Sequence, residues 1–145
     1  LKSGVTEVSE GGYTWKLRIH KGEATIFGYT SKSSFYVTAI SPEPIGALKI
    51  PETLGGAKVT AIGPRAFSQC KKLTEVDIPA GIKLIGDSAF RSCSELKTVR
   101  FHHLDQLPKV NAAFNGEQTI SFHAPAKMRK KSKTFNGQKV IYDLK

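Results

Sequence analysis

Apolar and polar side chains alternate in the segment LTEVDIP, residues 73–79. Val76 and Ile78 are apolar and Asp77 between them is charged, and this period of two predicts a strand with one buried face. The alternation recurs 23 residues later, where Val99 takes the place of Val76. The pattern therefore predicts short strands built to a common plan.

The segment before this strand predicts a turn and a short helix. Ile62-Gly63 is an apolar-glycine step, at which glycine can adopt a positive φ and turn the chain. Pro64 suits the first turn of a helix, and Asp87 suits an N-cap in the equivalent later segment. Four residues at spacings i, i+1, i+4 and i+7 then form one helical face: Ala66, Phe67, Cys70 and Leu73.

These elements belong to a unit that the chain repeats. AIGPRAFSQC (61–70) and LIGDSAFRSC (84–93) share Ile, Gly, Ala, Phe and Cys at the same places, 23 residues apart. AFNGEQTISF (113–122) and TFNGQKVIYD (134–143) form a second, more degenerate pair 21 residues apart. One unit cannot bury its apolar face alone, so we expect the units to stack. The phenylalanines of the units, Phe67, Phe90, Phe114 and Phe135, are predicted to lie in the core.

Residues 1–46 lack the repeat. Residues 13–19 alternate apolar and polar side chains, and residues 23–30 follow them across a short His20-Lys21-Gly22 turn. We expect a β-hairpin that caps the first repeat, followed by a connecting loop. The predicted division is a cap and loop at 1–46, then repeats at 47–145 with two full units followed by two degenerate capping units.

The full units IGPRAFSQCKKLTEVDIP and IGDSAFRSCSELKTVRF resemble the BspA-type leucine-rich repeat. The resemblance implies an α/β repeat fold, a short right-handed leucine-rich-repeat solenoid with parallel strands on its concave side. It also implies a secreted or surface-anchored bacterial protein of the kind often associated with adhesion, and hence an extracellular or cell-surface location. It supplies no catalytic group, and neither an enzyme nor a cofactor is expected.

The composition favours anionic partners without selecting one. The formal net charge of the 145 residues is +10, which suits nucleic acid, anionic glycan or a negatively charged surface. No motif of a nucleic-acid-binding fold accompanies the charge, so specific nucleic-acid binding is not expected. No run of about 18 apolar residues predicts a transmembrane segment.

Cysteines and histidines offer the only reactive groups that the repeat brings into line. Cys70 and Cys93 occupy equivalent positions, where two buried free thiols are favoured over a strained disulfide or a metal or redox site. His102 and His123 could stack as a weak metal site, but solvent-facing loop histidines, His103 included, are the expected reading and no metal is predicted.

Parallel stacking is expected to bring the exposed strand residues into columns on the concave face. The predicted ligand-binding residues are Lys49, Asp77, Arg100, Ser121 and Tyr142 in a central column, with Glu75, Thr98 and Thr119 beside it. Two interpretations stay open: a ladder of cross-strand ion pairs that satisfies itself, or a docking surface anchored by Arg100 and Tyr142.

A basic run near the C-terminus offers a second candidate surface. Its five cations, Lys127, Arg129, Lys130, Lys131 and Lys133, are expected on a loop and could contact an anionic polymer. The sequence as a whole predicts a non-enzymatic recognition or adhesion module that binds an extracellular protein or glycan. The alternatives are a structural spacer or assembly module of a larger surface protein, and a polyanion-binding domain.

Overall fold

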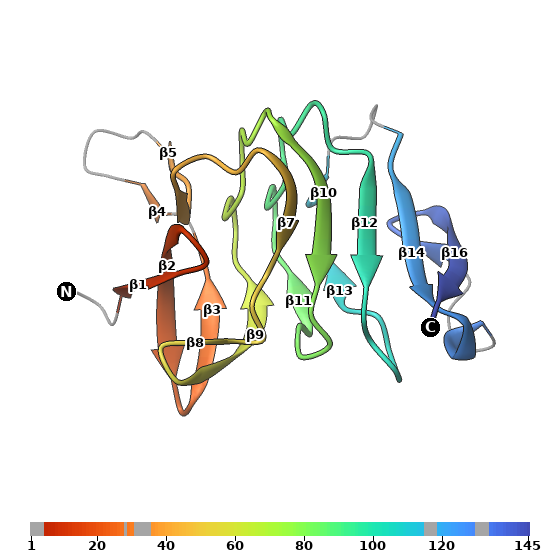
Figure 1. The fold of residues 1–145 in the computed structure, drawn as a ribbon, viewed down its shortest axis with the longest axis horizontal. Helices are drawn as coiled ribbons and strands as arrows, with labels where there is room; N and C mark the ends of the chain where they lie inside the picture. The colour runs from red at the N-terminus through yellow and green to blue at the C-terminus, as the bar shows by residue number, and fades with distance from the viewer. Residues whose placement is uncertain (1–4, 28, 31–35, 115–118, 130–133) are drawn as a thin grey trace.

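The computed structural model describes residues 5–27, 29–30, 36–114, 119–129 and 134–145. Two layers of β-strands enclose the core (Figure 1). The strands in chain order are β1 Val5–Glu10, β2 Tyr13–His20, β3 Glu23–Ile26, β4 Tyr29–Thr30, β5 Tyr36–Val37, β6 Ile40–Ser41, β7 Gly46–Lys49, β8 Thr53–Leu54, β9 Ala57–Ile62, β10 Leu73–Ile78, β11 Leu84–Ile85, β12 Thr98–Phe101, β13 Lys109–Val110, β14 Ser121–Pro125, β15 Thr134–Phe135 and β16 Gln138–Leu144.

The front sheet, nearer the viewer in Figure 1, has the strand order β7-β10-β12-β14-β16 with all neighbours parallel, and β15 pairs antiparallel with β16. The back sheet contains the parallel series β3-β9-β11-β13. The chain passes from a front strand through a link to a back strand, and then through turns to the next front strand. The expected parallel stacking of repeat units is therefore confirmed.

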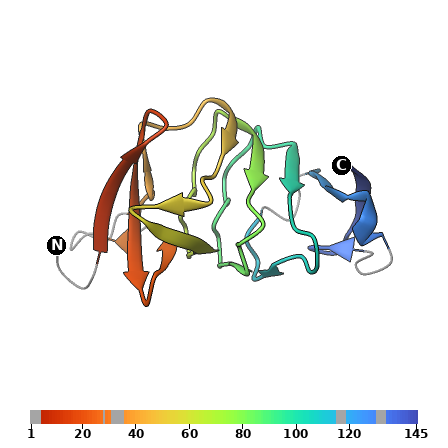
Figure 2. The same ribbon diagram turned by 60° about the horizontal axis from the view of Figure 1, so that its bottom comes forward.

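Of the hairpin expected at residues 13–30, the structure confirms the part from Tyr13 to Ile26, because Tyr29 and Thr30 belong to a separate small sheet. β2 and β3 pair antiparallel from Leu17↔Ile26 to His20↔Glu23. Lys21 and Gly22, which join them, both have a positive φ, as a tight two-residue turn between strands requires. β1 extends this antiparallel group at one end of the molecule, and β14 to β16 lie at the other (Figure 2). Because β3 also pairs with β9, the hairpin is continuous with the back sheet.

The expected helix is absent: the segments around Phe67 and Phe90 are successive tight turns, and the only helix among the described residues is the 3-10 turn η2, Ala126–Met128. Four residues of these turns adopt a positive φ, which an α-helix excludes: Arg65, Gln69, Ser88 and Ser92. The helix of the expected α/β class is therefore not found in the described residues, which form a leucine-rich-repeat-like fold of parallel sheets with few helices.

Hydrogen bonds between units explain why turns replace a helix. The backbone N–H groups of Phe67 and Gln69 donate to Ala89 and Arg91 of the next unit, at 2.8 and 2.7 Å. The intervening N–H of Ser68 donates to the carbonyl of Arg65, three residues back in its own unit. Donors that a helix would satisfy internally thus alternate between the turn and the neighbouring unit.

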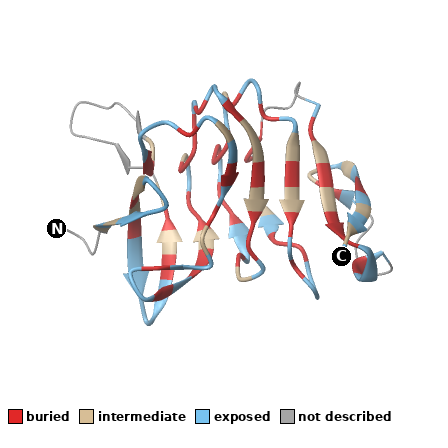
Figure 3. Ribbon diagram, in the orientation of Figure 1, coloured by how far each residue is buried: buried red, intermediate tan, exposed pale blue. Residues whose placement is uncertain are grey.

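The space between the sheets is filled by aromatic and branched side chains. Phe67, Phe90 and Phe114 stack across three units, with ring centroids 5.3 and 5.2 Å apart. All four repeat phenylalanines, Phe135 included, are buried, as predicted. Along the front strands, buried residues alternate with half-buried ones (Figure 3).

Within the described ranges, no helix is long and apolar enough to cross a bilayer.

Close approach, and not a positive φ, explains the glycines of the repeat. Neither Gly63 nor Gly86 is among the glycines with a positive φ, so that expectation is wrong. A Cβ added at Gly86 would lie 2.9 Å from the backbone nitrogen of Pro64 and 3.0 Å from the carbonyl carbon of Gly63. Glycine is needed here because the backbones of successive units almost touch.

Candidate binding surface on the front sheet

The register of the front sheet aligns its outward side chains in two rows. Asp77 lies between Lys49 and Arg100, and Arg100 is followed by His123 and then Ile141. The second row runs Glu75, Thr98, Ser121. We call these eight residues the outer ladder: Lys49, Glu75, Asp77, Thr98, Arg100, Ser121, His123 and Ile141.

The predicted columns are correct through Arg100 and wrong beyond it. Ser121 pairs with Thr98 in the second row, not with Arg100. Thr119 precedes β14 and belongs to no strand. Tyr142 is half-buried against the core, because the inward face of β16 carries Val140 and Tyr142 while Ile141 points outward.

His123 and Ile141 are the ladder residues that sequence reasoning missed. The signal for His123 was present, because Phe122 follows Val99 by the same 23 residues that separate Val99 from Val76. Aligning Phe122 with Val99 places His123 opposite Arg100, as the structure does. The 21-residue spacing of the degenerate units diverted the alignment.

Ion pairs link the centre of the outer ladder. The guanidinium of Arg100 donates to the carboxylate of Glu75 and lies 3.5 Å from Oδ1 of Asp77. The hydrogen bond to Glu75 is the main cause that raises the pKa of Arg100 above its ordinary value. Lys49 is the register partner of Asp77 but forms no ion pair with it, nor with any other described residue. The expected cross-strand pairing is thus present on one side of Asp77 only.

A depression of about 280 Å³ lies at the Lys49 end of the outer ladder. Its lining includes Lys49, Glu52, Asp77 and His102. Oδ1 of Asp77 is buried and accepts no hydrogen bond, although Nε2 of His102 lies 3.6 Å away. Because this oxygen is shielded from solvent and Nη1 of Arg100 lies 3.5 Å from it, a ligand at this depression would contact the side chains around Oδ1 and not the oxygen itself.

At the C-terminal end of the outer ladder, a polar pair borders an exposed apolar side chain. Nδ1 of His123 lies 2.8 Å from Oδ1 of Asp143, and Ile141 is 44% exposed. The ladder therefore runs from charged side chains at its centre to a mixed polar and apolar end.

The two cysteines are buried free thiols, as favoured from the sequence. Sγ of Cys93 donates to the carbonyl oxygen of Phe67 at 3.1 Å. A hydrogen bond with Cys93, together with burial, raises the pKa of the Cys70 thiol. Because the thiolate is the reactive form, Cys70 acts as a core side chain. The described residues contain no group of three or more His, Cys, Asp or Glu side chains that could hold a metal ion.

The other predicted groups divide between the surface and the core. Lys127 and Arg129 are exposed at η2, while Lys130, Lys131 and Lys133 lie outside the described residues. His102 is exposed as expected. The expectation for His103 is wrong, because this residue is only 3% exposed. It lies in the segment after β12, its ring meets Phe101, and its Nε2 lies 2.7 Å from the carbonyl oxygen of Ile82 in the segment after β10.

Two parallel sheets, repeat-to-repeat turn bonding and a stacked phenylalanine at each turn define a leucine-rich-repeat-like protein. The family model described as BspA type leucine rich repeat region matches residues 44–141 in six copies. The chain belongs to this family.

Three leucine-rich-repeat proteins are among the solved structures that match this chain. A leucine rich cell surface protein of Faecalibacterium prausnitzii is 21% identical, with a TM-score of 0.47 over 85% of this chain and 27% of that one. A leucine-rich repeat protein of Bacteroides capillosus is 23% identical, with a TM-score of 0.47 over 81% of this chain and 97% of that one. A third, from T. pallidum, is 16% identical, with a TM-score of 0.46 over 77% and 69% of the two chains. A comparison with curated proteins found no significant match.

Proposed function

We propose that this protein is a non-enzymatic recognition module, secreted or held at the bacterial cell surface, that binds an extracellular protein or glycan through the outer ladder. In this proposal the front sheet is the concave wall of a short right-handed solenoid. The observation that carries the proposal is the register of the front sheet, which presents side chains that the core does not specify in continuous rows.

The chemistry of the outer ladder supports a mixed-polarity ligand. Arg100 offers several donors at the centre, and arginine is enriched at the energetic centres of binding sites. The carboxylate of Asp77 lies beside Arg100, and the apolar Ile141 lies at the far end. A ligand that reaches from the depression to Ile141 would meet a charged, a polar and an apolar contact in turn.

A binding screen against matrix proteins and glycans tests the proposal. We expect Arg100→Glu to weaken the affinity of the selected ligand by about tenfold or more, since a central anchor contributes at least 1–2 kcal/mol. Arg91→Glu makes the same change of charge at an exposed residue of the turns and should leave the affinity unchanged. Unchanged affinity in Arg100→Glu would exclude the outer ladder as the binding surface.

The same screen separates the two alternatives. A structural spacer binds none of the probes. A polyanion binder loses affinity steeply as salt is added, and neutralising Lys130 and Lys131 removes its binding while Arg100→Glu weakens it no more than Arg91→Glu does.

A further inference from the structure

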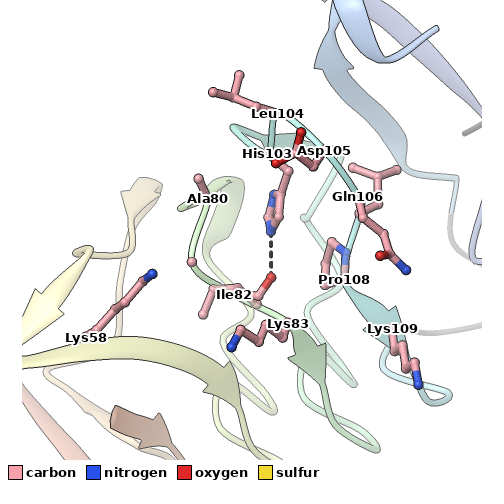
Figure 4. Close-up of a pocket in the computed structure, with 12 residues that line it drawn as sticks. Lys58, Ala80, Ile82, Lys83, His103, Leu104, Asp105, Gln106, Pro108 and Lys109 are labelled. Atoms are coloured by element: carbon pink, nitrogen blue, oxygen red, sulfur yellow. Dashed lines mark hydrogen bonds between the residues drawn. The ribbon is translucent and has the colours of Figure 1, made fainter. Parts of the chain in front are cut away.

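A second depression, of about 470 Å³, lies at the edge of the molecule where the front strands lead into the back strands (Figure 4). It is lined by the links that follow β10 and β12 and by Lys58 of β9. Lys83 ends the link after β10 and Lys109 begins β13, so three lysines from three successive passes of the chain line one space. We call this space the basic pocket. None of its residues belongs to the outer ladder.

Positive side chains outnumber negative ones in the lining of the basic pocket. Lys58, Lys83 and Lys109 are all exposed, and none of them forms an ion pair with any residue that the structure describes. Asp105 is the one acidic residue of the lining, so three positive charges and one negative charge leave a formal charge of +2. His103 adds none at neutral pH, because burial lowers its pKa.

One hydrogen bond and one close approach of the backbone shape the walls of the basic pocket. The carbonyl of Ile82 can only accept, so Nε2 of His103 carries the proton and ties the link after β12 to the link after β10 at 2.7 Å. A Cβ at Gly81 would lie 3.0 Å from Cε of Lys58. Glycine at this position therefore leaves room for the Lys58 side chain to lie across the link toward the basic pocket.

We infer that the basic pocket binds the phosphate group of a phosphorylated sugar. A phosphate monoester carries a charge close to −2 at neutral pH, which matches the formal charge of the basic pocket. Lysine ammonium groups bind phosphate as point charges without a demand for planar geometry. The volume of the basic pocket lies in the range of small-ligand sites, and the side chain of Gln106 in its lining offers a partner for sugar hydroxyls.

Calorimetric titration with glucose 6-phosphate, glucose 6-sulfate, glucose and inorganic phosphate at constant ionic strength tests the inference. Glucose 6-phosphate should bind more tightly than glucose 6-sulfate, whose ester carries one negative charge, and glucose should not bind. Lys58→Gln and Lys83→Gln should each weaken glucose 6-phosphate binding by about threefold to fivefold, the effect of one exposed ion pair. These lysines are exposed, so the variants should unfold at the same temperature as the parent protein.

Two controls make the result specific. Lys72→Gln removes one charge from an exposed lysine at the opposite end of β10, and Arg100→Gln removes one from the outer ladder. Neither should change glucose 6-phosphate binding. Absence of binding, or equal weakening in Lys72→Gln and Lys83→Gln, would overturn the site. Equal affinity for inorganic phosphate, or tighter binding of glucose 6-sulfate, would overturn the assignment of a phosphorylated sugar.

Discussion

Along β10, β12 and β14 the inner face of the front sheet aligns Val76, Val99 and Phe122, whereas the outer face one residue further on aligns Asp77, Arg100 and His123. The inner residues are fully buried and chemically alike. The outer ones carry a negative charge, a positive charge and a titratable ring. The inner face therefore fixes the register of the strands. Side chains on the outer face can differ from unit to unit with little change in the free energy of unfolding.

The largest contrast between the two faces is expected at the two ends of β12, Phe101 and Thr98. Phe101→Ala should lower the free energy of unfolding by about 3–5 kcal/mol, because it removes a fully buried ring that contacts three others. Thr98→Ala on the outer face should change it by less than about 0.5 kcal/mol. Urea unfolding measures both, and similar losses would show that the faces are not energetically distinct.

Gly86→Ala should come next, since the register of both faces depends on the approach of successive units. The added methyl group meets the backbone of Pro64, which cannot rotate away, so we expect a loss of about 1–3 kcal/mol in unfolding free energy. Ser94→Ala, at an exposed position of the same unit, is the matched control. A Gly86→Ala protein as stable as the control would mean that the units can separate locally without penalty.

The buried side chain of His103 should make the stability of the fold depend on pH. Burial lowers the pKa of His103 in the folded protein below its ordinary value of 6.5. The unfolded chain therefore takes up a proton at a higher pH than the folded one, and stability present above about pH 6.5 is lost as the pH falls. Between pH 7.5 and 5.5 the melting temperature should drop, and His103→Gln should flatten this dependence. A His103→Gln protein whose melting temperature falls as steeply as that of the parent protein would contradict this assignment.

The smallest stability effect is expected for the ion pairs of the outer ladder. Arg100 and Glu75 are 35% and 37% exposed in their side chains, and exposed pairs contribute about 0–1 kcal/mol. Arg100→Gln should therefore lower the unfolding free energy by less than about 1 kcal/mol. A double-mutant cycle with Glu75→Gln measures the coupling between the two. A coupling well above that value would make the outer ladder part of the framework of the fold.

The repeat could be predicted from the sequence because identical residues recur at a constant spacing, and stacking follows from burial of Phe67 and Phe90. The short helix could not be excluded, since the spacing of Ala66, Phe67 and Cys70 suits tight turns equally well. What decides between them is whether the N–H of Phe67 bonds within its unit or to Ala89 of the next. That choice depends on the neighbouring backbone, which a single unit does not reveal.

For the candidate surfaces, the Lys49–Asp77–Arg100 row follows from the strand pattern alone. Tyr142 was misplaced because β16 pairs with β14 through Phe122↔Val140, a separation of 18 residues that no earlier unit shows. The burial of His103 depends on the position of the Ile82 carbonyl, and the basic pocket depends on how two links and β9 lie together. Both are properties of how the links fold against one another.

Trp15 can serve as a fluorescence probe of one part of the fold. It is the single tryptophan of the chain, is 1% exposed, donates its Nε1–H to the carbonyl of Glu10 and meets the first ring of the phenylalanine stack edge-on at 6.2 Å. Its fluorescence therefore comes from one place, the seam between the N-terminal strands and the first repeat. A red shift in emission would report the opening of that seam, separately from any loss of order in the repeats beyond it.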